Sequence, residues 1–233
     1  METGLRVVGT LGGVGSGKST AARLLAEQTG GIVVDADQLV SELFRDSQVL
    51  SELEQAVAER LRTENGGLDR AKLAQRIFAD AKARLRVEAV LHPRVRTRIW
   101  SALDSWERER PGGLAVLDVP LLLEHGLSAA CDFLVFVEAP DDFRASRAMA
   151  RHGWSREEWA RREAVQAPVT AKRARADAIL FNDAGLERLR DQCATLAVRL
   201  QDLPARALRL RWPSPEEAPR PLSRPAPPPS GLR

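Results

Sequence analysis

The chain has 233 residues and a mass of 25.6 kDa, with 44% hydrophobic and 29% charged residues. This balance excludes a disordered or fibrous chain and predicts a globular protein with a large core. The net charge of +3 suggests a polyanionic partner. Only four of the 35 basic residues are lysines, however, and such an arginine bias can also come from genome composition, which weakens the suggestion. No apolar run reaches the ~20 residues of a membrane span, and neither a signal peptide nor a CxxC pair is visible. We therefore predict a cytoplasmic protein with no membrane partner.

Five short, almost continuously apolar segments predict the strands of a parallel sheet, because such strands are covered on both faces. Helical stretches separate the segments, as the connections between parallel strands require. The pattern predicts an α/β protein with three layers. The strands are expected at residues 5–10, 32–35, 114–119, 133–138 and 178–182.

The stretch between the second and third strands is too long for one crossover and carries apolar residues at helical spacing. It predicts a helical subdomain inserted into the fold. Later, nine basic residues and three glutamates lie between Arg144 and Arg175, and Ser155 to Glu158 reads as a capping box. This pattern predicts a helical, arginine-rich lid.

The predicted organisation is one domain over residues 1–203, followed by a tail. Residues 204–233 hold nine of the 14 prolines and are expected to be disordered. Within the domain, the core is expected at 1–37, 112–140 and 176–203, the helical subdomain at 38–111, and the lid at 141–175.

A phosphate-binding loop follows the first strand, since Gly12 to Ser19 fits the pattern G-x-x-x-x-G-K-[ST]. Glycines let successive N–H groups converge on phosphate oxygens, and the start of the next helix adds its own N–H groups. Lys18 is expected to reach the β- and γ-phosphates, and the Ser19 hydroxyl to bind Mg²⁺. The predicted ATP-binding residues of the loop are Gly13, Val14, Gly15, Ser16, Gly17, Lys18, Ser19 and Thr20.

Other classes of P-loop protein lack support, because the chain has neither the Asn-Lys of a GTPase base-reading motif nor a Leu-Ser-Gly-Gly signature. A small kinase with an arginine-rich lid remains. Arg147 and Arg151 lie one helical turn apart, so both could face a transferring phosphoryl group. A solvated helix face is the alternative interpretation.

Several further short motifs follow the loop in a fixed order. Together they are much more specific than the P-loop alone. They are Val34-Asp35-Ala36-Asp37, Gly67-Leu68-Asp69-Arg70, Leu91-His92-Pro93, Asp118-Val119-Pro120-Leu121-Leu122-Leu123-Glu124, Arg147, Arg151, Gln166, Ala176-Asp177 and Asn182.

With these motifs the chain resembles the dephospho-coenzyme A kinase family over roughly residues 5–200. The order Thr10-Leu11 departs from the family's usual Leu-Thr. The resemblance implies a P-loop fold with ATP and Mg²⁺, and transfer of the γ-phosphoryl group to the ribose 3′-hydroxyl of dephospho-coenzyme A. It also implies a kinase domain in three parts: a nucleotide-binding core, a helical substrate-binding subdomain and a lid. The alternatives are another P-loop kinase acting on a nucleoside or nucleoside monophosphate, and a nucleic-acid-binding P-loop protein. We expect no nucleic-acid partner and leave the oligomeric state open.

The resemblance also assigns roles, each with a structural alternative. Asp37, just past a strand end, is the expected base for the acceptor hydroxyl, with Asp35 or a helix cap as alternatives. Together with Lys18 and Arg147 it forms the predicted catalytic set, while Arg151 is expected to bind ATP.

Asp118 is expected to hold Mg²⁺ through water, or to be a turn residue. His92 is a candidate substrate contact or a structural histidine. Asn182 resembles a residue near adenine, with an Asx-turn as the alternative.

Overall fold

The computed structural model describes residues 4–213. The chain divides into two compact units, with boundaries after residues 33 and 111. The sheet unit is the part before residue 34 and after residue 111, and the helical unit is residues 34–111. Each unit has its own cluster of buried apolar side chains.

The sheet has five parallel strands in the order β2-β3-β1-β4-β5, which confirms the predicted α/β class. The chain crosses from one side of β1 to the other after β3. The carboxyl end of β1 therefore lies at the topological switch point, where open α/β sheets bind ligands. The strands are β1 (Arg6–Leu11), β2 (Ile32–Asp35), β3 (Leu114–Asp118), β4 (Phe133–Glu138) and β5 (Ala178–Phe181).

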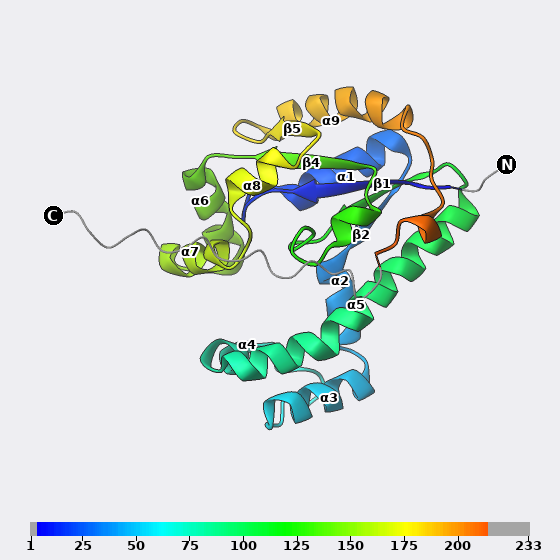
Figure 1. The fold of residues 1–233 in the computed structure, drawn as a ribbon. Helices are drawn as coiled ribbons and strands as arrows, with labels where there is room; N and C mark the ends of the chain where they lie inside the picture. The colour runs from blue at the N-terminus through cyan, green and yellow to red at the C-terminus, as the bar shows by residue number, and fades with distance from the viewer. Residues whose placement is uncertain (1–3, 214–233) are drawn as a thin grey trace, which may run out of the picture. The chain divides into compact units, whose positions relative to one another are not determined.

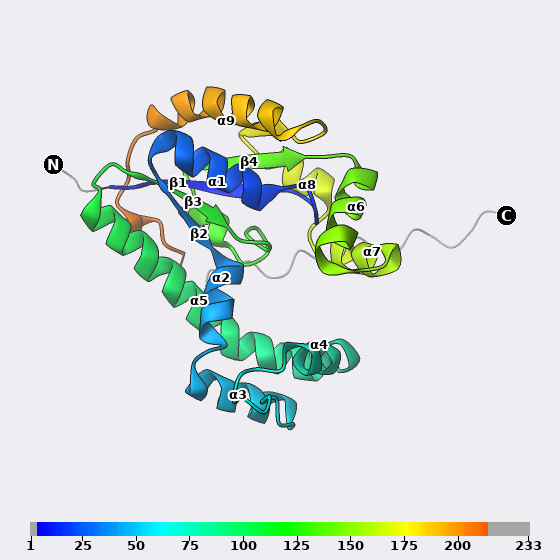
Figure 2. The ribbon, with the colours of Figure 1, turned by 180° about the vertical axis from the view of Figure 1, so that it is seen from behind.

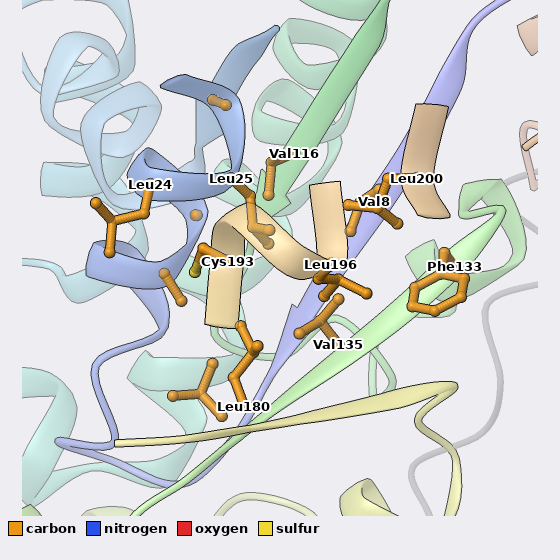
Figure 3. Packing of buried hydrophobic residues seen from close by; sticks show 14 of the residues in the cluster. Val8, Leu24, Leu25, Val116, Phe133, Val135, Leu180, Cys193, Leu196 and Leu200 are labelled. Carbon is orange, nitrogen blue, oxygen red and sulfur yellow. The ribbon is translucent and has the colours of Figure 1, made fainter. Parts of the chain in front are cut away.

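The core of the sheet unit lies between the sheet and two helices, α1 (Lys18–Thr29) and α9 (Leu186–Gln201), which lie on the same face (Figures 1 and 2). Val8 of β1 packs in this cluster with Leu25 of α1 and Leu196 of α9 (Figure 3). This packing fixes the start of α1 at the end of β1, and so fixes the loop between them.

Three short helices lie between β4 and β5, in the segment predicted to be the lid: α6 (Asp141–His152), α7 (Arg156–Ala164) and α8 (Val169–Ala174). The Ser155 hydroxyl accepts a hydrogen bond from the backbone N–H of Glu158 at 3.2 Å, as expected for the N-terminal cap of α7. A short 3-10 helix, η1, precedes β4 at Leu127–Ala130.

The helical unit contains four helices whose inner faces meet around Leu53 and Val87. Each helix starts at an aspartate whose carboxylate accepts hydrogen bonds from the first turn: Asp35, Asp46, Asp69 and Asp80. The helices are α2 (Ala36–Leu43), α3 (Ser47–Val57), α4 (Arg70–Ala79) and α5 (Ala81–Glu109). Among all helices of residues 4–213, none is both long and apolar enough to cross a membrane.

The predicted disorder of the tail is wrong for residues 204–213, which pack against the sheet unit. Leu5 and Arg206 exchange two backbone hydrogen bonds, of 3.0 and 3.2 Å. In the 3-10 helix η2 (Leu208–Leu210), the side chain of Leu208 is fully buried. The composition did not predict this ordered segment, because its few apolar residues lie among prolines and arginines. The rest of the predicted tail, residues 214–233, lies outside the described residues.

Two of the three arginines of this segment are paired with a carboxylate. Arg206 and Arg211 both form ion pairs with Asp132, at 2.6 Å for the Arg206 pair. The buried Asp132 carboxylate also accepts a hydrogen bond from the Val7 N–H at 2.7 Å. Residues 204–213 therefore hold the start of β1 through one shared carboxylate.

Candidate active site

The phosphate-binding loop joins the carboxyl end of β1 to the start of α1. Gly15 and Gly17 have φ angles of 81° and 94°, which residues with side chains rarely adopt. The hydroxyl of Ser16 is fully buried and has no hydrogen-bond partner within residues 4–213. Ser19 and Thr20 lie in the first turn of α1; the Thr20 N–H donates to the Gly17 carbonyl at 3.0 Å, and the N–H groups before it at the helix start face the loop without an i−4 acceptor. This set of donors suits phosphate oxygens.

Neighbouring segments approach the loop so closely that side chains at three positions would collide with them. A Cβ atom on Gly13 would overlap the guanidinium of Arg144, and one on Gly15 would overlap the backbone of Arg144. A Cβ atom on Gly17 would overlap the side-chain amide of Asn182. The glycines therefore permit close packing as well as the curvature of the loop.

Lys18 turns back onto the loop, where its ammonium donates to the carbonyls of Gly12 and Gly13 at 3.0 and 2.9 Å. Burial lowers the pKa of Lys18 to about 8, and repulsion by Lys172 acts in the same direction. The charge of Asp118 opposes this shift. A phosphate group would supply the negative charge that this lysine lacks.

Asp118 ends β3 and is almost fully buried beside β1. The hydroxyl of Thr10 donates to the Leu117 carbonyl at 3.1 Å and lies 3.5 Å from Asp118 Oδ1. The unusual Thr10-Leu11 order therefore places a hydroxyl beside the strand-end carboxylate. The charge of Asp118 also raises the pKa of Lys18, against the effect of burial.

Asn182, just after β5, is hydrogen-bonded to the loop. Its side-chain amide donates to the Ser16 carbonyl at 2.8 Å. Arg147 on α6 donates to the Asn182 carbonyl at 3.1 Å and to its Oδ1 at 3.4 Å. Of the two predicted lid arginines, Arg147 is thus bound to Asn182, whereas Arg151 is exposed.

The tip of the loop is bound by α7, in the segment predicted to be the lid, through both backbone polar groups of Val14. Glu163 Oε2 accepts from the Val14 N–H at 2.7 Å, and Trp159 Nε1 donates to its carbonyl at 3.1 Å. Arg144 Nη1 binds the other oxygen of Glu163 at 2.6 Å, and the guanidinium lies 5.3 Å from the centre of the Trp159 ring. We call Arg144, Trp159 and Glu163 the lid clasp.

A second buried cation lies near the loop. The Lys172 side chain is 2% exposed, and its ammonium donates to Gln166 Oε1 at 2.6 Å. Its distance to Glu124 Oε1 is 3.6 Å, and the same oxygen accepts from the Ala167 N–H. Burial lowers the pKa of Lys172, and the Glu124 carboxylate opposes this. Lys172 thus adds positive charge that acts on Lys18, partly balanced by the Glu124 carboxylate.

The remaining predicted residues lie in the helical unit. Asp35 caps α2, since its carboxylate accepts from the N–H groups of Asp37 and Gln38 at 2.9 and 3.1 Å. Asp37 lies in the first turn of α2 and is exposed, so the suggestion that Asp37 itself caps this helix is wrong. His92 is exposed on α5, next to Pro93 inside the helix.

Four residues around the loop were not predicted to belong to the site: Arg144, Trp159, Glu163 and Lys172. Two signals were present in the sequence. Trp159 and Glu163 lie one turn apart on a predicted helix, and Lys172 is one of only four lysines in an arginine-rich chain. Neither signal indicates which partner these side chains contact.

Comparison with known proteins shows the family of this chain. The family model described as dephospho-CoA kinase matches residues 6–188. A curated dephospho-CoA kinase of Deinococcus radiodurans is 41% identical over 187 residues, which cover 80% of this chain and 88% of that protein. One of Symbiobacterium thermophilum is 37% identical over 190 residues, covering 81% and 78%.

Solved structures agree with this match. TT1252 from Thermus thermophilus has a TM-score of 0.69 and 38% identity, covering 84% of this chain and 98% of its own. The dephospho-CoA kinase from Campylobacter jejuni, at 20% identity, has the same fold, with a TM-score of 0.59 and coverage of 84% and 97%.

Proposed function

Since this chain belongs to the dephospho-CoA kinase family, it phosphorylates the ribose 3′-hydroxyl of dephospho-CoA with ATP, and we propose which of its residues do this. The products are coenzyme A and ADP, so the reaction is the last step of coenzyme A synthesis. The observation that best supports an ATP site is the structure of the loop. Its glycines, orphaned Ser16 hydroxyl and buried Lys18 form a polyanion site at the end of β1.

We propose that the loop N–H groups and Lys18 bind the β- and γ-phosphates of ATP. Phosphoryl transfer needs cations around the transferred group more than covalent chemistry from the protein. Lys18 meets this need because burial and Lys172 disfavour its charge more than Asp118 and Glu163 favour it, so a further anion beside the ammonium is stabilising. Positive charge there stabilises the phosphate oxygens as the bond to ADP breaks.

Mg²⁺ is proposed to bind with ATP rather than on its own. In residues 4–213 there is no group of three or more His, Cys, Asp or Glu side chains suited to hold a metal. The oxygens present, the Ser19 hydroxyl and the Asp118 carboxylate, fit a Mg²⁺ ion that keeps waters and shares phosphate ligands. When bound, the ion would neutralise charge on the phosphates; Ser19 would bind it directly and Asp118 through water.

Asp37 is proposed to orient the acceptor hydroxyl and accept its proton. It follows the carboxyl end of a strand, as ligand-binding residues of α/β sheets do, and it is exposed. The carboxylate of Asp35 is already used to cap α2, which favours Asp37 of the two. His92 is proposed as a further contact for dephospho-CoA, in line with the family motif it occupies.

Arg147 and Arg151 are proposed to bind phosphate oxygens of ATP from the lid. In the structure Arg147 donates to Asn182, so this role requires Arg147 to exchange these hydrogen bonds for phosphate oxygens. Such exchanges accompany lid movements in many kinases. We also propose that the protein is cytoplasmic. We propose no nucleic-acid partner, because Arg206 and Arg211 already pair with Asp132.

The activity is tested by incubating the protein with MgATP and dephospho-CoA, and separately with nucleoside monophosphates. We expect ADP to form only with dephospho-CoA, and phosphorus NMR to show a new 3′-phosphomonoester. Turnover of nucleoside monophosphates alone would contradict the assignment. Retention on DNA that weakens steeply with salt would contradict the proposed absence of a nucleic-acid partner.

A further inference from the structure

Glu163 holds the loop as a phosphate oxygen would. Its carboxylate accepts the Val14 N–H through Oε2 at 2.7 Å and binds Arg144 through Oε1 at 2.6 Å. A backbone N–H of a glycine-rich loop on one side and a guanidinium on the other are the partners that phosphate oxygens take. The carboxylate is therefore an anion already present at the loop.

The lid clasp fixes this carboxylate in place. Trp159, one turn before Glu163 on α7, donates to the Val14 carbonyl, so the helix holds the same residue at two points. Arg144 is 3% exposed and, within residues 4–213, pairs with one further carboxylate, that of Asp141, at 2.8 Å. The position of Glu163 is thus set by several contacts and is not that of a loose surface side chain.

Glu163 also lies in the electric field of the phosphate-binding lysine, since its charge raises the pKa of Lys18 against the effect of burial. A triphosphate bound to Lys18 would bring at least three further negative charges beside this carboxylate. Like charges at such a site repel strongly, because burial reduces the screening by water. The carboxylate and the triphosphate therefore compete for the same cations.

We propose that Glu163 is a resident anion of the P-loop that the triphosphate of ATP displaces, so that Glu163 weakens ATP binding. When Glu163 leaves, Arg144 loses one carboxylate partner and gains a phosphate oxygen, and α7 is released from Val14. Glu163 is thus a determinant of ATP affinity and contributes no group to the chemical step. This inference rests on the proposed binding of ATP at the loop.

The test measures the dissociation constant of MgATP by calorimetry for the wild type and for Glu163→Gln. The glutamine keeps an oxygen for the Val14 N–H but removes the charge. We expect Glu163→Gln to bind ATP about tenfold more tightly. The matched control is Glu157→Gln, which removes the same charge from an exposed position of α7 and should leave the affinity unchanged.

An equal or weaker affinity of Glu163→Gln for ATP would overturn the inference. If Glu163→Gln does not fold because Arg144 loses its partner, Arg144→Gln and the double variant Arg144→Gln/Glu163→Gln replace it in the comparison. The double variant should bind ATP several-fold more tightly than Arg144→Gln alone, and equal binding would overturn the inference. A wild type that does not bind ATP would instead contradict the proposed function.

Discussion

The side-chain amide of Asn182 donates a hydrogen bond to the carbonyl of Ser16 at 2.8 Å, and so ties the end of β5 to the phosphate-binding loop. The loop follows β1, which is separated from β5 in the sheet by β4. Gly17 permits this contact, because any side chain at that position would overlap the Asn182 amide. Asn182 therefore supports the loop whatever else it contacts in the complex with ATP.

Asn182→Ala should weaken the binding of both ATP and inorganic triphosphate by about tenfold, because the loss of one buried hydrogen bond costs about 1–3 kcal/mol. Binding of the two ligands can be compared by calorimetry. A loss with ATP alone would contradict the loop-support role and favour a contact to adenine, as the family resemblance implies.

Lys18→Ala should lower kcat by about a thousandfold or more, since it removes a cation from the transferred phosphoryl group. The protein should still unfold cooperatively, because the core between the sheet and α1 does not depend on this side chain. The matched control is Lys82→Ala at an exposed position of α5, which should keep the wild-type kcat. Near-normal turnover of Lys18→Ala would contradict the phosphate contact.

ATP binding should weaken as the pH rises from 7 to 9. Burial, with repulsion by Lys172, lowers the pKa of Lys18 to about 8, so the free enzyme loses this charge within that interval. ATP binds the protonated form more tightly, and at pH 9 only about a tenth of the sites carry it, which predicts an affinity about tenfold lower. Lys18→Arg stays charged and should show a much flatter profile. An equally steep profile in that variant would assign the titration to another group.

Asp37→Asn should lower kcat strongly while ATP still binds, because the amide cannot accept the proton of the acceptor hydroxyl. Asp35→Ala should instead lower the free energy of unfolding by about 1 kcal/mol, since it removes the cap of α2. Steady-state kinetics and thermal unfolding separate the two effects. A large loss of kcat in Asp35→Asn, with Asp37→Asn active, would reverse the assignment.

The strands were predictable because each is a nearly unbroken apolar run, and the loop because its glycines, Lys18 and Ser19 follow a fixed spacing. The lid clasp was not. Arg144 and Glu163 are two charges among many in an arginine-rich segment, and a hydrogen bond to the backbone of Val14 leaves no trace in the sequence at position 14. Contacts that one side chain makes with a distant backbone group depend on packing rather than on local pattern.

Residues 204–213 also show that composition does not reveal tertiary contacts, here because order was missed. Proline and arginine content predicted disorder at 204–213, yet Leu208 is buried and Arg211 binds a carboxylate that is 3% exposed. A chain ending at residue 203 should therefore be less stable than one ending at 213, by about 3–5 kcal/mol, because Asp132 loses both cationic partners while buried. Chemical denaturation of the two truncated chains measures the difference, and equal stability would contradict it.

The close approach of Arg144 to Gly13 has a consequence for redesign. Gly13 does not have a positive φ, so backbone strain does not explain why this position requires glycine. The requirement comes from α6 and α7, because a Cβ atom at position 13 would overlap the Arg144 guanidinium and lie 2.6 Å from Glu163 Oε1. Alanine at 13 should be tolerated only when the side chains at 144 and 163 are both shortened, so the three positions behave as one unit when loop sequences are exchanged between kinases.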